Sequence, residues 1–182
     1  SIRIDGVEHE FATLTGMKED VAELILNIKQ LKLRIHGRES RTIRVEKSGP
    51  GKVSAADIES DSNVEVLNPD LHLATLNTDG TLKMEMTVKG GRGYSQADMN
   101  KEEDQPIGVI PIDAIFSPLE RVNYHVENAR VGQATDYDRL ILEVWTDGSI
   151  APADAIARAG RILRDHLMVF IGEEVGAEVE KT

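Results

Sequence analysis

Residues 71–88, LHLATLNTDGTLKMEMTV, contain the clearest structural signal in this chain. On both sides of the centre, apolar and polar residues alternate, which is the period of a half-buried β-strand. Between the two runs, Asn77-Thr78-Asp79-Gly80 is typical of a hairpin turn. The stretch therefore predicts two antiparallel strands, 71–76 and 81–88, joined by a tight turn.

The same period recurs on both sides of this stretch, so the sequence predicts a small and mainly antiparallel β region. Residues 48–51, Ser-Gly-Pro-Gly, break the period and predict a loop. The other predicted strands are 32–36, 42–46, 64–67, 109–116, 121–131 and 140–145.

A first helix is predicted at residues 17–31. Its apolar positions fall at i, i+3, i+4, i+7 and i+10, which is one face of a helix. Thr15 is the expected cap, and Glu19 and Asp20 are expected in the first turn, where the helix dipole favours carboxylates. The apolar positions are Val21, Leu24, Ile25, Ile28 and Leu31.

A second helix is predicted at residues 152–171, with Pro152 at its first position, where a missing N–H costs nothing. Its apolar stripe is wider and longer than packing on one small sheet requires. Such a stripe favours a subunit that associates with other chains. The stripe contains Ile156, Ala159, Gly160, Leu163, Leu167, Phe170 and Ile171.

The composition excludes several classes of function. The 182 residues include 21 Lys+Arg and 32 Asp+Glu, and the net charge of −11 argues against a grip on nucleic acid phosphates. The absence of Cys excludes thiol catalysis, Cys-ligated zinc and iron–sulfur clusters. No apolar run approaches the ~20 residues of a membrane-spanning helix.

No set of residues forms a credible active site, and no metal ligand set is expected. The five histidines are scattered, with none paired at metal-ligand spacing. Asp136 and Asp138 are two carboxylates that could hold Mg²⁺, although a solvated turn explains them better. The alternative function left open is therefore a small, acidic enzyme that depends on a divalent metal.

A set of motifs in register carries a resemblance to a known family. Over residues 2–172 the chain resembles the alpha subunit of bacterial DNA-directed RNA polymerase, a subunit with no catalytic residues of its own. The motifs are SPLERV (117–122) with Tyr124, VENARVGQ (126–133), TDYDRL (135–140), residues 4–7 with 9–10, residues 16–29, GRGY (91–94), and residues 147–150 with 152–156.

The resemblance implies an α+β amino-terminal domain that dimerises and serves as the platform on which the two large subunits assemble. Residues 1–116 would be a β-rich insert lobe. Residues 117–172 would be the second half of a dimerisation lobe of antiparallel strands and a long C-terminal helix. An acidic linker would start at 173–182. The family's first dimerisation helix has no counterpart before Ser1, and its DNA-contacting domain has none after Thr182.

The resemblance also implies partners and a location. The expected partners are a second copy of the chain, the beta and beta-prime subunits, and transcription activators. No direct contact with DNA and no membrane is expected for this segment. No cofactor is expected either, because the Mg²⁺ of the assembled polymerase sits in other subunits. The expected location is the bacterial cytosol.

Individual residues are assigned on the same likeness. Lys29 matches an interface with one large subunit, and Ile112 and Asp113 match an interface with the other. Local explanations compete: Lys29 ends a helix, where a cation suits the dipole, and Ile112 alternates inward in a strand. The acidic run Glu102, Glu103 and Asp104 matches an activator contact, with a solvated charge run as the alternative. The dimer interface would contain Ile156, Ala159, Leu163, Leu167 and Phe170.

Overall fold

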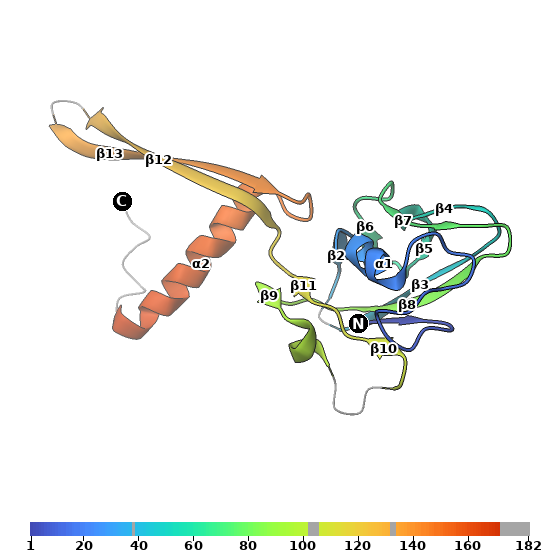
Figure 1. Ribbon diagram of the computed structural model, residues 1–182. Helices are drawn as coiled ribbons and strands as arrows, with labels where there is room; N and C mark the ends of the chain where they lie inside the picture. The colour runs from blue at the N-terminus through green and yellow to red at the C-terminus, as the bar shows by residue number, and fades with distance from the viewer. Residues whose placement is uncertain (38, 102–105, 132–133, 172–182) are drawn as a thin grey trace. The chain divides into compact units, whose positions relative to one another are not determined.

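The computed structural model describes residues 1–37, 39–101, 106–131 and 134–171. The fold is α+β, as predicted, with mostly antiparallel strands and a long C-terminal helix (Figure 1). The chain divides into two compact units, Ser1–Ser117 and Pro118–Thr182, called unit 1 and unit 2 below.

Unit 1 is built from an antiparallel five-stranded sheet and three two-stranded sheets. In spatial order the large sheet contains β10 (Val109–Ile110), β1 (Ile2–Ile4), β8 (Thr81–Val88), β3 (Arg41–Ser48) and β5 (Ile58–Glu59). The small sheets pair β4 (Gly51–Ser54) with β7 (His72–Leu76), β2 (Leu33–Ile35) with β6 (Val64–Val66), and β9 (Tyr94–Ser95) with β11 (Ala114–Ile115). Short 3₁₀ turns, η1 and η2, cover Ala55–Asp57 and Ala97–Asn100.

Strands β7 and β8 form as predicted, but the prediction that they pair with each other as a hairpin is wrong. β7 pairs with β4, whereas β8 pairs with β1 and β3 in the five-stranded sheet. Leu73 and Ala74 are adjacent and both buried, so β7 is covered on both of its faces. The turn 77–80 therefore carries the chain from one sheet to another. β4 itself was missed because Gly51 belongs to the loop signal.

The turn after β7 is fixed by a close approach of two glycines. The Asn77 N–H donates to the Gly16 carbonyl at 2.8 Å. A Cβ built on Gly80 would lie 2.3 Å from the Gly16 oxygen, and Gly16 has a φ of +84°. Only residues without a side chain permit this backbone contact.

The hydrophobic core lies entirely in unit 1, among the described residues. It is formed by alternate residues of the large sheet, by β7 and by one face of the first helix. Its largest fully buried side chains are Ile2, Ile4, Leu24, Ile43, Leu73, Leu82 and Met84.

The first helix, α1, covers Val21–Ile28 and is shorter than the predicted 17–31. Its cap is Asp20, whose carboxylate accepts from the Glu23 N–H at 2.7 Å, and not Thr15. Met17 instead forms a β-bridge with Leu76, so the chain is extended where the helix was predicted to begin. Periodicity identified the buried face correctly, but it carries no information on this tertiary pairing.

Glu19 lies before α1 and ties the start of the helix to β7. Its carboxylate faces the His72 Nε2 at 2.9 Å and accepts from the Thr75 N–H at 2.6 Å and the Thr75 hydroxyl at 3.0 Å. Burial opposes the charged form, yet these hydrogen bonds outweigh it and lower the pKa of Glu19 to about 2.

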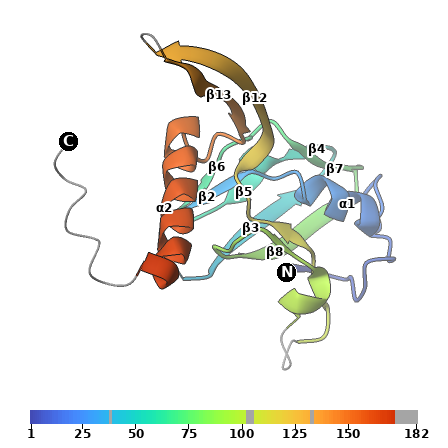
Figure 2. The ribbon, with the colours of Figure 1, turned by 90° about the vertical axis from the view of Figure 1, so that its left-hand side faces the viewer.

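The described residues of unit 2 form a long two-stranded ribbon and one helix. β12 (Leu119–Val131) and β13 (Ala134–Thr146) pair antiparallel along their length and form a twisted ribbon (Figure 2). After a turn in which Asp147 Oδ1 accepts from the Ser149 N–H at 2.8 Å, α2 covers Pro152–Ile171 as predicted.

The Gly16–Gly80 contact predicts a steric cost for a single methyl group. Gly80→Ala should destabilise the chain by about 1–3 kcal/mol, because the new Cβ overlaps the Gly16 carbonyl. Gly90→Ala is the control, since a Cβ there meets nothing within 4 Å. Urea unfolding midpoints measure both, and equal midpoints for the two variants would contradict the close contact.

The Glu19 network predicts a pH-dependent contribution to stability. A carboxylate whose folded pKa is lowered stabilises the fold above its unfolded pKa, near 4.5, and loses this contribution as pH falls toward 2. Glu19→Gln should therefore be less stable than the wild type by on the order of 3 kcal/mol at neutral pH. The difference should shrink between pH 4.5 and 2.

Chemical denaturation of both proteins between pH 2 and 7 measures this difference. Glu10→Gln, at an exposed turn position, is the control and should track the wild type. If the difference in unfolding free energy between wild type and Glu19→Gln does not change with pH, the lowered pKa of Glu19 is contradicted.

Candidate functional site

Unit 2 has an unusual surface. No described side chain of this unit is buried, although the ribbon and α2 are both rich in apolar residues. An isolated two-stranded ribbon is at best marginally stable in water, and apolar side chains are stabilised when they leave it. The described part of unit 2 therefore presents apolar surface suited to further contacts.

One exposed surface is the helix stripe, which we define as Ile156, Ala159, Leu163, Leu167 and Phe170. These are the residues that the sequence assigned to a dimer interface, and α2 presents all of them as exposed side chains on one face. Leu163 is 65% exposed and Phe170 is 86% exposed. The opposite side of α2 carries Arg158, Arg161 and Asp165, so the helix is amphipathic.

A second apolar surface lies on the ribbon. Directly opposite residues of an antiparallel pair share a face, and alternate residues along a strand do too. Three successive pairs on one face are apolar, and we call them the ribbon face: Val122 with Val144, Tyr124 with Leu142, and Val126 with Leu140. The next pair on that face, Asn128 with Asp138, is polar.

The other side of the ribbon is mainly polar. The pairs there include Asn123 with Glu143 and Glu127 with Arg139. At the end of the ribbon the Arg121 guanidinium lies 3.6 Å from the centre of the Trp145 ring, and this cation–π contact covers the indole. The ribbon is thus amphipathic, although sequence reasoning singled out only its strands. The alternation of Val122, Tyr124 and Val126 was the signal that could have identified the face.

In unit 1 the structure brings Lys29 and Asp113 together. Lys29 is the C-cap of α1, and its ammonium forms an ion pair with the Asp113 carboxylate. The Tyr94 hydroxyl donates to the other carboxylate oxygen at 3.3 Å. The hydrogen bond from Lys29, with that of Tyr94, holds the pKa of Asp113 below its usual range.

The segment around Asp113 is not the continuous strand 109–116 that the sequence predicted. Ile112 lies between β10 and β11 and packs, half-buried, against the core. Its carbonyl accepts from the Asn100 Nδ2 at 3.0 Å, and the Ser95 hydroxyl donates to Asn100 at 2.9 Å. The Asn100 bond satisfies the Ile112 carbonyl where the chain has left the sheet after Ile110, and the Ser95 bond holds the Asn100 amide.

Two exposed apolar side chains lie next to this ion pair. Tyr94 and Ile115 stand directly opposite each other in the β9–β11 pair, with exposed fractions of 59% and 72%. We call Lys29, Asp113, Tyr94 and Ile115 the ion-pair surface. The Lys29–Asp113 contact and the part played by Tyr94 and Ile115 could not be read from sequence, because the four residues come from separate elements.

Of the remaining predicted residues, only Asp138 has a side chain that the structure describes. Glu102, Glu103 and Asp104 lie outside the described residues, as does the side chain of Asp136. Asp138 is exposed on β13. Within the described ranges, no group of three His, Cys, Asp or Glu side chains could hold a metal ion.

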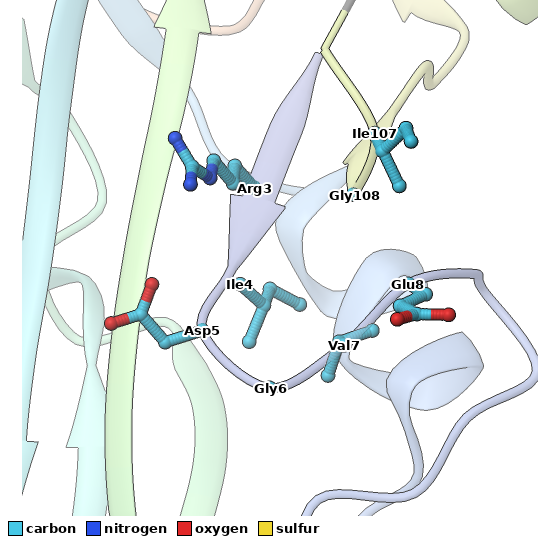
Figure 3. A pocket seen from close by; sticks show the side chains of 8 residues that line it. All are labelled: Arg3, Ile4, Asp5, Gly6, Val7, Glu8, Ile107 and Gly108. Atoms are coloured by element: carbon cyan, nitrogen blue, oxygen red, sulfur yellow. The ribbon is translucent and has the colours of Figure 1, made fainter.

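The clefts of unit 1 are shallow. The one in Figure 3, of about 320 Å³, is lined by the turn after β1 and by Ile107 and Gly108. Asp5 and Glu8 stand apart in it, with Ile4 and Val7 between them (Figure 3). The residues lining it therefore include no close pair of carboxylates for acid–base chemistry. A second cleft lies along α1 beside Glu19 and His72, whose polar groups already bind each other.

No helix in the described part of the chain combines the length and the apolar character needed to cross a bilayer.

Comparison with known proteins gives a consistent result. Residues 2–117 match the family model described as "RNA polymerase Rpb3/RpoA insert domain". Three similar proteins each carry the name DNA-directed RNA polymerase subunit alpha. They come from Alkaliphilus oremlandii (56% identical over 171 residues, 94% of this chain), Moorella thermoacetica (55% over 181, 98%) and Desulforamulus reducens (58% over 172, 94%).

The chain spans 54%, 58% and 55% of the length of these three relatives, respectively. The matched family region also ends at Ser117, where unit 1 ends. The chain therefore belongs to the RNA polymerase Rpb3/RpoA insert-domain family and is similar over nearly its whole length to alpha subunits of DNA-directed RNA polymerase.

Proposed function

We propose that this chain is the assembly part of an RNA polymerase alpha subunit, which pairs with a second copy and holds the beta and beta-prime subunits for DNA-templated transcription. The observation that supports it most directly is the surface of unit 2. The helix stripe and the ribbon face apart from half-buried Val144 are exposed there, and no described side chain is buried. A chain built to be covered by partners has this distribution of apolar side chains.

The helix stripe is assigned to the contact with a second copy. In a two-fold symmetric contact the same patch occurs on both chains, so a single apolar stripe can cover itself. Leu163 and Phe170 have the largest exposed fractions among the large side chains of the stripe and are the expected anchors. The flanking arginines and Asp165 would form the polar rim.

The ion-pair surface, with Ile112 beneath it, is assigned to the contact with a large subunit. The family likeness attributes Lys29 to one large subunit and Ile112 and Asp113 to the other. Because Lys29 and Asp113 are in direct contact, we treat them as one surface. Tyr94 and Ile115 supply the apolar area, and the Lys29–Asp113 pair supplies charged groups beside it.

The chain contributes structure and not chemistry in this proposal. Nucleotidyl transfer, its Mg²⁺ and the direct contact with DNA belong to other parts of the polymerase, which works in the bacterial cytosol. The run Glu102, Glu103 and Asp104 is proposed as an activator contact on the family likeness alone. No observation favours the metal-dependent enzyme as a second function.

The role of the helix stripe is tested by one buried charge. Leu163→Asp should abolish self-association of the intact subunit, because an unpaired carboxylate would be enclosed in the apolar contact. Light scattering coupled to size-exclusion chromatography measures the mass of the purified subunit and so distinguishes a monomer from a dimer. Val169→Asp is the matched control, since Val169 is more exposed than Leu163 but lies on the other side of α2. A dimer that tolerates Leu163→Asp would contradict the assignment.

The ion-pair surface is tested in the same way with the purified large subunits. Ile115→Asp should lower their recovery with the tagged alpha subunit by about tenfold, which corresponds to about 1.4 kcal/mol. Ile107→Asp, at a strongly exposed position elsewhere in unit 1, should leave recovery unchanged. Equal recovery with both variants would exclude this surface, provided that circular dichroism shows both to be folded.

A further inference from the structure

Among its described residues, the segment from Lys89 to Ser117 is tied to the core of unit 1 through the pairing of β10 with β1 and through Ile110 and Ile112. Among its described residues, only Ile110 is buried. The β9–β11 pair contains two residue pairs, and it is extended by one bond from the Phe116 N–H to the Gly93 carbonyl at 2.7 Å. With so little apolar burial, the position of this small ribbon depends on specific side-chain contacts.

Most of the polar contacts described above lie within the segment itself. Tyr94 and Asn100 each bond to the stretch 112–113, and both belong to the same segment. The ion pair with Lys29 is different, because it comes from α1, far away in sequence. It links the ribbon to the folded core.

Lys29 is well placed to act as an anchor. Its N–H donates to the Ile25 carbonyl at 3.0 Å, and the preceding residue, Ile28, is buried in the core. The backbone carbonyl of the next residue, Gln30, accepts from the Asn68 Nδ2 at 3.0 Å. The backbone that carries the ammonium is therefore held on both sides.

The side chains of the pair are neither fully exposed nor enclosed. Lys29 is 34% exposed and Asp113 is 24% exposed. An ion pair of this kind adds little to global stability, because water screens it. It can still determine which of several arrangements a weakly packed ribbon adopts.

We propose that Lys29 and Asp113 are positioning residues, whose ion pair fixes the β9–β11 ribbon against α1 so that Tyr94 and Ile115 meet a large subunit as one preformed apolar surface. This inference rests on the proposed function. It differs from direct recognition, in which Lys29 and Asp113 would each bind a charged group of the partner.

A charge swap separates the two roles. Lys29→Glu places two carboxylates side by side, Asp113→Lys places two ammonium groups side by side, and the double variant restores an ion pair of reversed polarity. For positioning, each single variant should weaken assembly of the intact subunit with the large subunits by about fivefold or more, and the double variant should return to within about twofold of wild type. Recovery of the complex is the measurement.

Direct recognition gives the opposite result, because the double variant then presents two wrong charges to the partner. The fold-decrease in assembly for the double variant would then equal or exceed the product of the fold-decreases for the two single variants. This outcome would overturn the proposal.

Hydrogen exchange of the intact subunit without partners provides a second readout. Both single variants should speed exchange in 93–95 and 114–116 while leaving α1 and β8 unchanged, and the double variant should restore protection. Unchanged exchange in the single variants would also overturn the positioning role.

The proposed function can fail separately. If Ile115→Asp leaves assembly intact, the surface itself is wrong. If Ile115→Asp blocks assembly and the double charge-swap variant does not restore it, the ion-pair surface is supported as the contact with a large subunit, and the positioning role of Lys29 and Asp113 is wrong.

Discussion

Burial of apolar side chains is confined, in the described chain, to residues between Ile2 and Ile110. Each square ångström of apolar surface removed from water contributes about 25 cal/mol, so this core is the main source of apolar stabilisation in the described chain. Its helix face, its five-stranded sheet and β7 enclose each other. The described apolar side chains of unit 2 are therefore left without a core of their own.

Unit 2 shows the consequence. Its long ribbon pairs only β12 with β13, and both the ribbon and α2 keep an apolar face exposed. Secondary structure of this kind is incomplete in its packing. In the proposed function, contact with other chains would supply the missing burial, which gives an assembly subunit a physical reason to be built this way.

The charged groups of the chain follow a related rule. The chain is strongly acidic, but the carboxylates with lowered pKa values are those that hold elements together. Glu19 joins the start of α1 to β7, Asp57 binds Lys47 beside a 3₁₀ turn, and Asp113 joins the β9–β11 ribbon to α1. In each case hydrogen bonds to the carboxylate favour its charged form.

From sequence alone, periodicity identified the buried face of α1, most of the strands and the whole of α2, because those patterns are local. The motif order led to the correct family. Predictions from local pattern were wrong where a segment pairs with a partner that is distant in sequence. Met17 pairs with Leu76 instead of joining the helix. The turn at 77–80 connects two sheets instead of the two strands of one hairpin.

Tertiary structure alone decided the rest of the candidate site. Lys29 and Asp113 were each selected by likeness, but their contact, and the exposure of Tyr94 and Ile115 beside it, arise only when segments separated in sequence are folded together. A side chain's sequence neighbours determine its local conformation. Its partners across the fold determine whether its charge binds another chain or holds its own chain in place.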